Sequence, residues 1–328
     1  MNDTVRNRPA SPKDEERTAP APLKVITAVD ILTVVGLVVM TPIAWLLPER
    51  YWPVLGRGVL AVVMGIAPAW VRKRARWIER CVGARTLPMP SSNVALYGLS
   101  RYFEDNLLLL KCYRPDRWSP RIEVEGIENL RAVRTPGRGV VLWFSHFHHY
   151  SLVSKAGMHG AGFAMSHLSH PRHGFSASRF GMHYLNRVRT LIEDRYLGER
   201  VYLGLDDASA ALATLREHLC AGRVISSAAR AVARRPVPAP FLGGTLPLAT
   251  GAPVLARETG AALLPVHVVQ TEPGRYRVII EPEIAMDRSA TKWAAAEVAA
   301  REYARRLEPV VLCYPDQWEG WPVMTIAA

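Results

Sequence analysis

GRGVVLWFSHFHHYS, residues 137–151, joins a short apolar run to a histidine-rich segment. Gly139–Phe144 contains no polar side chain and follows the turn-forming Pro136-Gly137-Arg138, so it is predicted to form a strand that is buried on both faces. His146 comes two residues after this strand, at the edge where α/β sheets bind their ligands. A histidine at such a position can act as a general base near neutral pH.

Strands and helices alternate on both sides of this stretch. Four more strands are predicted, at 201–205, 223–225, 262–269 and 276–280, and Pro273-Gly274 is predicted to join the last two in a hairpin or tight connection. Helices are predicted at 93–113, 206–222, 248–259 and 289–307. The alternation predicts an α/β fold: one mixed, mostly parallel sheet covered by helices, with residues 31–70 packed at one edge.

The N-terminal part has a different composition. Residues 1–24 are polar and proline-rich and are predicted to form a disordered tail. Residues 25–80 are expected to form an apolar, membrane-associating helical segment with a basic end, before an α/β domain at 81–328. Its run 31–47 has 17 uncharged residues, and a spanning helix needs about 20. A single span and a helix lying in the membrane interface therefore both remain open.

The basic charge favours an anionic partner. Lys and Arg number 41 against 29 Asp and Glu, a net charge of +12. The cluster Arg72–Arg76 follows a second apolar run, 54–70, and would lie on anionic lipid headgroups on the cytoplasmic side. No RNA-recognition motif, zinc finger or basic-helix pattern accompanies the charge, so we expect no nucleic-acid partner.

The sequence contains few of the motifs that mark metal, nucleotide or catalytic-serine sites. Eight of the ten histidines lie between His146 and His183, but 145–183 contains no Asp, Glu or Cys, so we expect no metal site and no cofactor. A GxSxG elbow, a GxGxxG loop and a Walker loop are missing from the sequence. Gly243-Gly244 could enter a helix whose N–H groups hold an anion, but these residues alone favour a plain turn.

Three blocks resemble one known family. Residues 137–151, 238–284 and Tyr314–Trp318 (YPDQW) are similar, in that order, to blocks of the late lipid A acyltransferases, the lauroyl and myristoyl transferases of the lysophospholipid acyltransferase superfamily. The resemblance covers roughly residues 30–320. It implies a glycerol-3-phosphate acyltransferase-like fold and a position at the cytoplasmic face of the bacterial inner membrane.

The resemblance also implies a reaction. His146 would deprotonate a hydroxyl or amine of an anionic membrane lipid or lipid-like acceptor, which then attacks the thioester of an acyl carrier protein or acyl-CoA. Substrate-binding roles would fall to one arginine of the set that follows the histidine-rich segment and to residues of the second block: Arg172, Phe241, Gly243, Gly244 and Thr250. Arg179, Arg187 and Arg189 belong to the same arginine set, which could hold a phosphate or the phosphopantetheine of the carrier protein.

One departure from the family bears on catalysis. The family places an acid five residues after the histidine, where this chain has Ser151. A hydroxyl can hydrogen-bond to the site but cannot stabilise an imidazolium by charge. Either Asp206 or Asp207 replaces the acid, or the acceptor deprotonates easily, or the chain is a catalytically silent relative that binds lipid or carrier protein. If only the charge is missing, Ser151→Glu should raise transfer.

Overall fold

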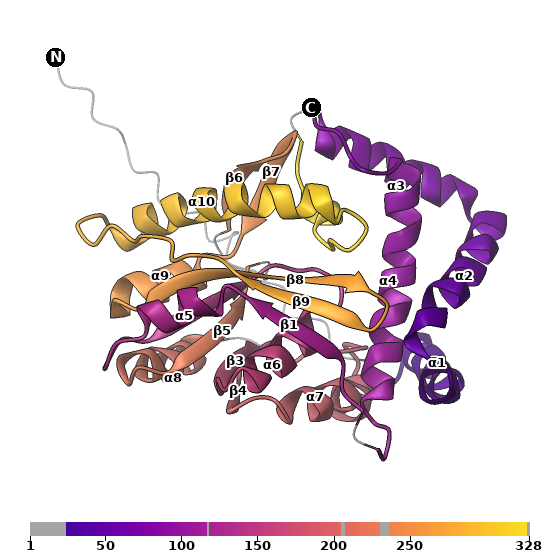
Figure 1. Cartoon of the computed structure of the whole chain (residues 1–328), viewed down its shortest axis with the longest axis horizontal. Coiled ribbons are helices and arrows are strands. Elements are labelled where there is room, and N and C mark those ends of the chain that lie inside the picture. The colour runs from indigo at the N-terminus through magenta and orange to yellow at the C-terminus, as the bar shows by residue number, and fades with distance from the viewer. Residues whose placement is uncertain (1–23, 117, 205–206, 230–235, 327–328) are drawn as a thin grey trace, which may run out of the picture.

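The computed structural model describes residues 24–116, 118–204, 207–229 and 236–326 (Figure 1). Apart from Lys24, the tail expected at 1–24 lies outside the described residues, and so does Asp206.

A seven-stranded sheet forms the centre of the molecule, with strand order β1-β9-β8-β2-β5-β3-β4. Its strands are β1 (Arg121–Glu125), β2 (Val140–Phe144), β3 (Met165–Ser169), β4 (Glu199–Tyr202), β5 (Val224–Ala228), β8 (Ala262–Glu272) and β9 (Arg275–Ile280). Every neighbouring pair is parallel except β8 and β9, which form the hairpin around Pro273-Gly274. The predicted mixed, mostly parallel sheet is thereby confirmed.

β2 runs through the middle of the sheet, because it pairs with β5 on one side and β8 on the other. Its side chains alternate between two hydrophobic clusters. Val141 and Trp143 pack with residues of the helices at 209–220, 251–259 and 292–313. Val140, Leu142 and Phe144 pack with residues of the helices at 91–111, 127–133, 150–160 and 186–194. This two-sided burial explains why the strand is continuously apolar.

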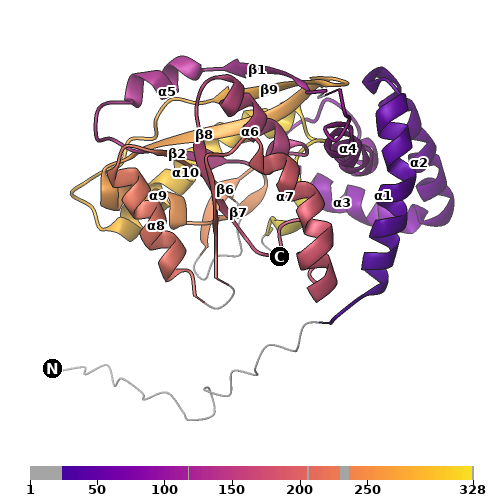
Figure 2. The same ribbon diagram turned by 90° about the horizontal axis from the view of Figure 1, so that it is seen from below.

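Seven helices of the described chain accompany the sheet: α4 (Ser91–Lys111), α5 (Ile127–Val133), α6 (Tyr150–Gly160), α7 (Asn186–Asp194), α8 (Ser209–Cys220), α9 (Gly251–Thr259) and α10 (Lys292–Cys313). Figure 2 shows α8 beside α9 and α6 beside α7. The four helices expected from the sequence correspond to α4, α8, α9 and α10.

The glycine pair Gly243-Gly244 does not enter a helix, and of the two interpretations the turn is the one that holds. Leu242-Gly243 forms the turn of a two-stranded hairpin, β6 (Val237–Phe241) with β7 (Gly244–Leu248), and Gly244 is the first residue of β7. The backbone N–H of Gly243 donates to the carbonyl of Cys81 at 2.7 Å, and a Cβ on Gly243 would lie 2.9 Å from the Cα of Gly83. The close approach of two backbones therefore accounts for a glycine at 243.

Three further helices, α1 (Ala28–Leu46), α2 (Trp52–Ile66) and α3 (Pro68–Val82), form a layer outside α4 (Figure 1). α4 crosses the end of the sheet where the parallel strands terminate, since Arg101 of α4 donates to Gln270 near the end of β8 at 2.7 Å. Residues 31–70 thus lie on α4 at this end of the sheet. The carboxyl ends of the parallel strands and the apolar helical layer are brought to the same side of the molecule.

Much of the outer surface of α1 and α2 is apolar, including Leu32, Val38, Val62 and Ile66. In the described chain, α1 is the one helix long and apolar enough to cross a membrane by itself, and α2 and α3 qualify only as a pair bent by 104°. The apolar layer is therefore available for contact with lipid.

Candidate functional site

His146 lies just beyond β2, in a sharp turn that leads into α6. The turn passes through His149, whose φ of 68° is left-handed, an uncommon conformation for a residue other than glycine. α6 then begins at Tyr150, and the Tyr150 hydroxyl lies 3.3 Å from Nε2 of His146. The Nδ1 atom of His146 is buried, so Nε2 is the nitrogen that faces Tyr150 and can meet a substrate.

A carboxylate reaches this turn from the C-terminal end of the chain. The backbone N–H of Glu319 donates to the carbonyl of His146 at 2.9 Å, and Glu319 Oε1 lies 3.0 Å from Nδ1 of His148. Burial alone would raise the pKa of Glu319, but the hydrogen bond from His148 and the charges of His148 and His146 lower it below its ordinary value. Glu319 is therefore ionised near neutral pH, and its charge favours the protonated form of His146.

An apolar cavity lies against His146. It is lined by Ser145, His146, Ala229, Leu246, Leu248, Tyr303, Leu307, Trp318 and Gly320. Its volume is about 10 Å³, room for about one water molecule. Phe241 supports one wall, because its ring packs against Trp318 with the centroids 5.2 Å apart. These side chains would have to move apart to admit a longer apolar group.

Ser151 belongs to a buried charged cluster beneath the turn. Its hydroxyl donates to Oε1 of Glu193 on α7 at 2.6 Å. The same carboxylate is 3.1 Å from Lys155 Nζ, 2.9 Å from an Arg200 nitrogen and 3.1 Å from Nε2 of His173. Ser151, at the position where the family has its acid, thus contacts the carboxylate of a residue on another helix.

The charges within this cluster depend on one another. Burial would raise the pKa of Glu193, but the charge of Lys155, with help from His173 and Arg200, lowers it well below its usual range. Burial lowers the pKa of Lys155 to about 8, against the opposing charge of Glu193. At neutral pH the cluster therefore consists of the Glu193–Lys155 ion pair with Arg200 as a second cation, buried in the core.

Acid should therefore destabilise the fold through Glu193. The folded state lowers its pKa below the 4.5 of an exposed glutamate, so its stabilisation is complete above about pH 4.5 and is lost as the pH falls below that value. We expect the melting temperature to fall steeply between about pH 5 and pH 3, and Glu193→Gln to flatten this slope. The exposed Glu272→Gln is the control, and an unchanged slope in Glu193→Gln would contradict the assignment.

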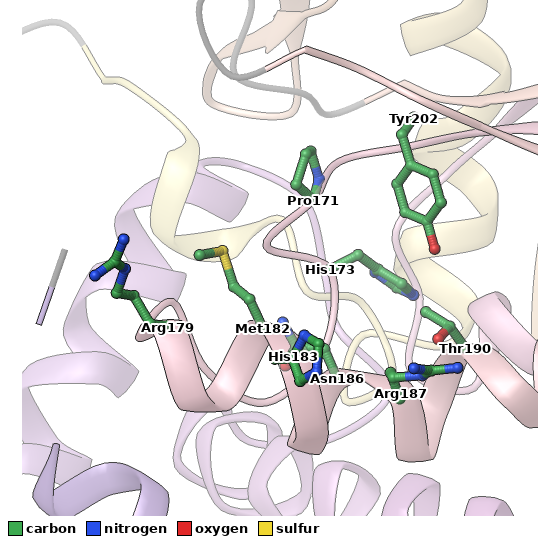
Figure 3. A pocket seen from close by; sticks show the side chains of 9 residues that line it. All are labelled: Pro171, His173, Arg179, Met182, His183, Asn186, Arg187, Thr190 and Tyr202. Atoms are coloured by element: carbon green, nitrogen blue, oxygen red, sulfur yellow. The ribbon is translucent and has the colours of Figure 1, made fainter. Parts of the chain in front are cut away.

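A larger cavity, of about 610 Å³, opens beside this cluster (Figure 3). Its walls are Pro171, His173, Arg179, Met182, His183, Asn186, Arg187, Thr190 and Tyr202. His173 connects it to the turn at His146, since His173 Nε2 is 3.3 Å from the Ser151 hydroxyl and Tyr150 precedes Ser151. The two arginines make the cavity suitable for an anionic group.

The other residues singled out from the sequence are spread over the molecule. Arg172 is exposed beside this cavity, and Arg189 is buried, donating to Asp105 at 3.0 Å. Asp207 is exposed on the connection between β4 and α8, where it accepts hydrogen bonds from Ser209. Thr250 is buried immediately before α9. Gly243, Gly244 and Thr250 are not among the described residues that line the cavity at His146.

The histidine-rich segment is split among separate partners. His148 faces Glu319, His149 Asp105, His159 Tyr196, His167 Ser226 and His173 Glu193. Burial lowers the pKa of His167 well below its ordinary value, so that histidine remains neutral. Among the residues that the structure describes, no group of three or more His, Cys, Asp or Glu side chains is arranged to hold a metal ion.

Sequence reasoning missed Tyr150, Glu193 and Glu319. Glu319 directly follows the YPDQW block, and that adjacency is a signal that could have identified it. Glu193 lies 42 residues after Ser151 on an otherwise ordinary helix, and nothing local marks it.

Comparison with known families gives one match. A family model described as bacterial lipid A biosynthesis acyltransferase matches residues 106–321, more than half of the 328-residue chain. The match begins inside α4, so α1, α2 and α3 precede it. No curated protein matches the chain.

Proposed function

The chain belongs to the bacterial lipid A biosynthesis acyltransferase family, and on this premise we propose that it moves a fatty acyl group from a thioester to a hydroxyl or amine of a lipid-like acceptor, with His146 as general base. The observation that carries the proposal is the position of His146. It lies at the carboxyl end of β2, between the ionised Glu319 and an apolar cavity.

The proposed reaction is a single displacement at the thioester carbonyl. His146 Nε2 takes the proton of the acceptor O–H or N–H, which replaces the Tyr150 hydroxyl as its hydrogen-bond partner. The acceptor atom bonds to the carbonyl carbon, and collapse of the tetrahedral intermediate breaks the C–S bond. The imidazolium then returns its proton to the leaving sulfur, so the histidine ends the cycle neutral.

Glu319 is the carboxylate that we assign to the imidazolium. Its charge interacts with His146 across the turn, and its own position is fixed by His148 and by its backbone hydrogen bond. A negative charge beside the histidine stabilises the cation that forms during proton transfer, as the buried Asp does in the Ser-His-Asp template. Asp207 is a weaker candidate than Glu319 for this role, because it is exposed and hydrogen-bonded to Ser209.

The two cavities suggest where the substrates lie. We assign the acyl chain to the apolar side chains beside His146, including Leu246, Leu248 and Leu307, which would part to admit it. We assign an anionic group of the acceptor to the cavity that holds Arg179 and Arg187. Planar guanidinium groups can bind a phosphate through two hydrogen bonds at once.

A catalytically silent relative is the second candidate, and one observation favours it. The carboxylate nearest to the family's acid position, Glu193, is bonded to His173, Lys155 and Arg200. A chain of this kind would bind the acyl donor without releasing its thiol. Release of free thiol together with formation of acylated product distinguishes the two.

The family is membrane-associated in bacteria, and we assign α1 to the membrane interface on the cytoplasmic face. Both ends of the helix are hydrogen-bonded to the α/β domain: the N–H of Phe180 donates to the carbonyl of Val25, and Trp45 Nε1 donates to that of Leu110. A helix held in this way lies along the domain surface, with its apolar side toward lipid.

The exposed apolar side of α1 should govern vesicle binding. We expect Leu32→Asp/Val38→Asp to release the protein from anionic vesicles in a flotation assay, because charged side chains resist transfer into hydrocarbon. Trp293→Asp/Val298→Asp on the exposed side of α10 is the matched control and should float like the wild type. Equal flotation of both variants would contradict the role of α1.

A further inference from the structure

A second basic surface lies on α3, outside the part of the chain that matches the family model. One stripe of the helix is apolar and packs inward: Val71, Ala75, Ile78, Cys81 and Val82 are buried. The opposite side carries five basic residues, at 72, 73, 74, 76 and 80, and a single acid, at 79. α3 is therefore an amphipathic helix whose outer surface is strongly cationic.

These cations are not neutralised by the protein. Within the parts of the chain that the structure describes, no salt bridge joins Lys73, Arg74, Arg76 or Arg80 to a carboxylate. Instead, Arg74 lies over the ring of Trp70, 5.5 Å from its centroid, and Arg80 lies 5.9 Å from that of Trp77. Cation–π contacts of this kind hold a guanidinium in place while leaving its N–H groups free for an anion.

The basic side chains line a cleft. α3 and the 3₁₀ turn Trp321–Val323 enclose about 610 Å³ between Trp70, Lys73, Arg74, Arg76, Trp77, Arg80, Trp321 and Pro322. The cleft is built on fixed contacts, because Trp77 Nε1 donates to the carbonyl of Trp321 at 2.7 Å and Trp321 Nε1 donates to that of Pro315 at 2.9 Å.

This cleft and the His146 cavity share one wall. Trp318 and Gly320 line the cavity, Trp321 lines the cleft, and the rings of Trp318 and Trp321 meet edge to face with centroids 4.9 Å apart. Between them in the chain, Glu319 faces His148. The cleft and the cavity are therefore neighbours, separated by these two rings.

Charge and shape separate this cleft from the lipid-facing surface. α1 and α2 expose many large apolar side chains, whereas Trp70 is the one large apolar residue that α3 exposes among the described residues. The chain bends by 104° where α2 passes into α3, and α3 then runs across α4 toward the β6–β7 hairpin (Figure 1). A helix with charge but little apolar surface is better suited to a phosphorylated ligand than to insertion in a bilayer.

We infer that the cleft between α3 and Trp321 binds the phosphate-linked pantetheine arm of the acyl donor and directs its thioester toward His146. This rests on the proposed function. The arm is common to acyl-CoA and to acyl carrier protein, and in both it joins a phosphodiester to the thioester through an amide chain. Lys73, Arg74, Arg76 and Arg80 would hold the phosphate, and the tryptophans would pack against the arm.

The test reverses two exposed charges of the cleft. Lys73→Glu/Arg76→Glu is compared with Arg301→Glu/Arg305→Glu, which changes the net charge equally on the exposed surface of α10. Both variants are assayed in neutral detergent, without anionic lipid. The donors are acyl-CoA and acylated carrier protein, each carrying an acyl group of a length that the wild type transfers. Binding of coenzyme A alone is measured by calorimetry.

We expect the cleft variant to raise the donor KM by about 10- to 100-fold with little change in kcat, to weaken coenzyme A binding, and to leave the acceptor KM unchanged. The α10 control should match the wild type in all of these. A rise in KM for both donors assigns the cleft to the shared phosphate, and a rise for the carrier protein alone assigns it to that protein.

Wild-type KM values for both donors, with a loss of binding to anionic vesicles, would overturn the inference and make the cleft a lipid headgroup surface. Failure of the proposed function gives a different result. In that case the wild type would release no thiol, yet coenzyme A would still bind and the cleft variant would still weaken it.

Discussion

His146→Ala should lower acyl transfer by about 10²- to 10⁴-fold, the usual contribution of a positioned general base. No other histidine at this turn offers a ring nitrogen to the same point. The ring of His148 is bonded to Glu319, and that of His149 is buried against Asp105 and Tyr276. The measurement is thiol release at saturating donor and acceptor. The loss should fall on kcat, because the alanine removes proton transfer rather than substrate binding.

His173→Ala is the matched control, because His173 is also paired with a carboxylate and lines a cavity. If His146 is the base, His173→Ala should cost about 10-fold or less. Its effect should appear mainly in the acceptor KM, because His173 lies in the wall of the cavity assigned to the acceptor. A large loss of kcat in His173→Ala, with His146→Ala active, would move the general base to the His173–Glu193 pair.

Ser151→Glu should reduce stability and activity rather than restore activity, contrary to the expectation from the sequence. The Ser151 hydroxyl lies 2.6 Å from the Glu193 carboxylate, so a glutamate at 151 would place two carboxylates in one buried site. One of them would be forced to protonate. Glu193→Ser alone should cost about 3–5 kcal/mol, because it leaves Lys155 and Arg200 buried without their partner.

The double variant Ser151→Glu/Glu193→Ser returns one carboxylate to the cluster and should recover much of this loss. Thermal unfolding of the two single variants and the double variant gives the coupling between the sites. Simple additivity of the two single effects would show that the two positions do not share one charge site.

Some features of the fold were readable from single segments. β2 is apolar on both faces because it lies between β5 and β8 under two layers of helices, and such burial leaves a direct trace in the residues. β3 escaped prediction because three of its four buried residues, Ser166, His167 and Ser169, are polar. His167 lies 2.8 Å from Ser226 on the neighbouring β5, a pairing that no local pattern reveals.

The candidate site shows the same division. His146 could be predicted from its place after a strand, but its carboxylate could not. Glu319 arrives from 173 residues away, through the bridge between Phe147 and Trp318 and the hydrogen bond from His148 to Gln317. The sequence left a helix entry and a turn both open at Gly243, because a glycine required by close contact with Gly83 looks the same as one required at a helix start.

The central claim, that this chain transfers acyl groups through His146, is tested most directly by one experiment on purified protein in anionic vesicles. Acyl carrier protein thioester and acyl-CoA are supplied with a bacterial lipid extract, and free thiol and acylated product are both quantified. The account predicts one acylated product for each thiol released, with both lowered about 10²- to 10⁴-fold by His146→Ala. Binding of the acyl donor without thiol release above the uncatalysed rate would contradict it and identify the chain as a silent relative.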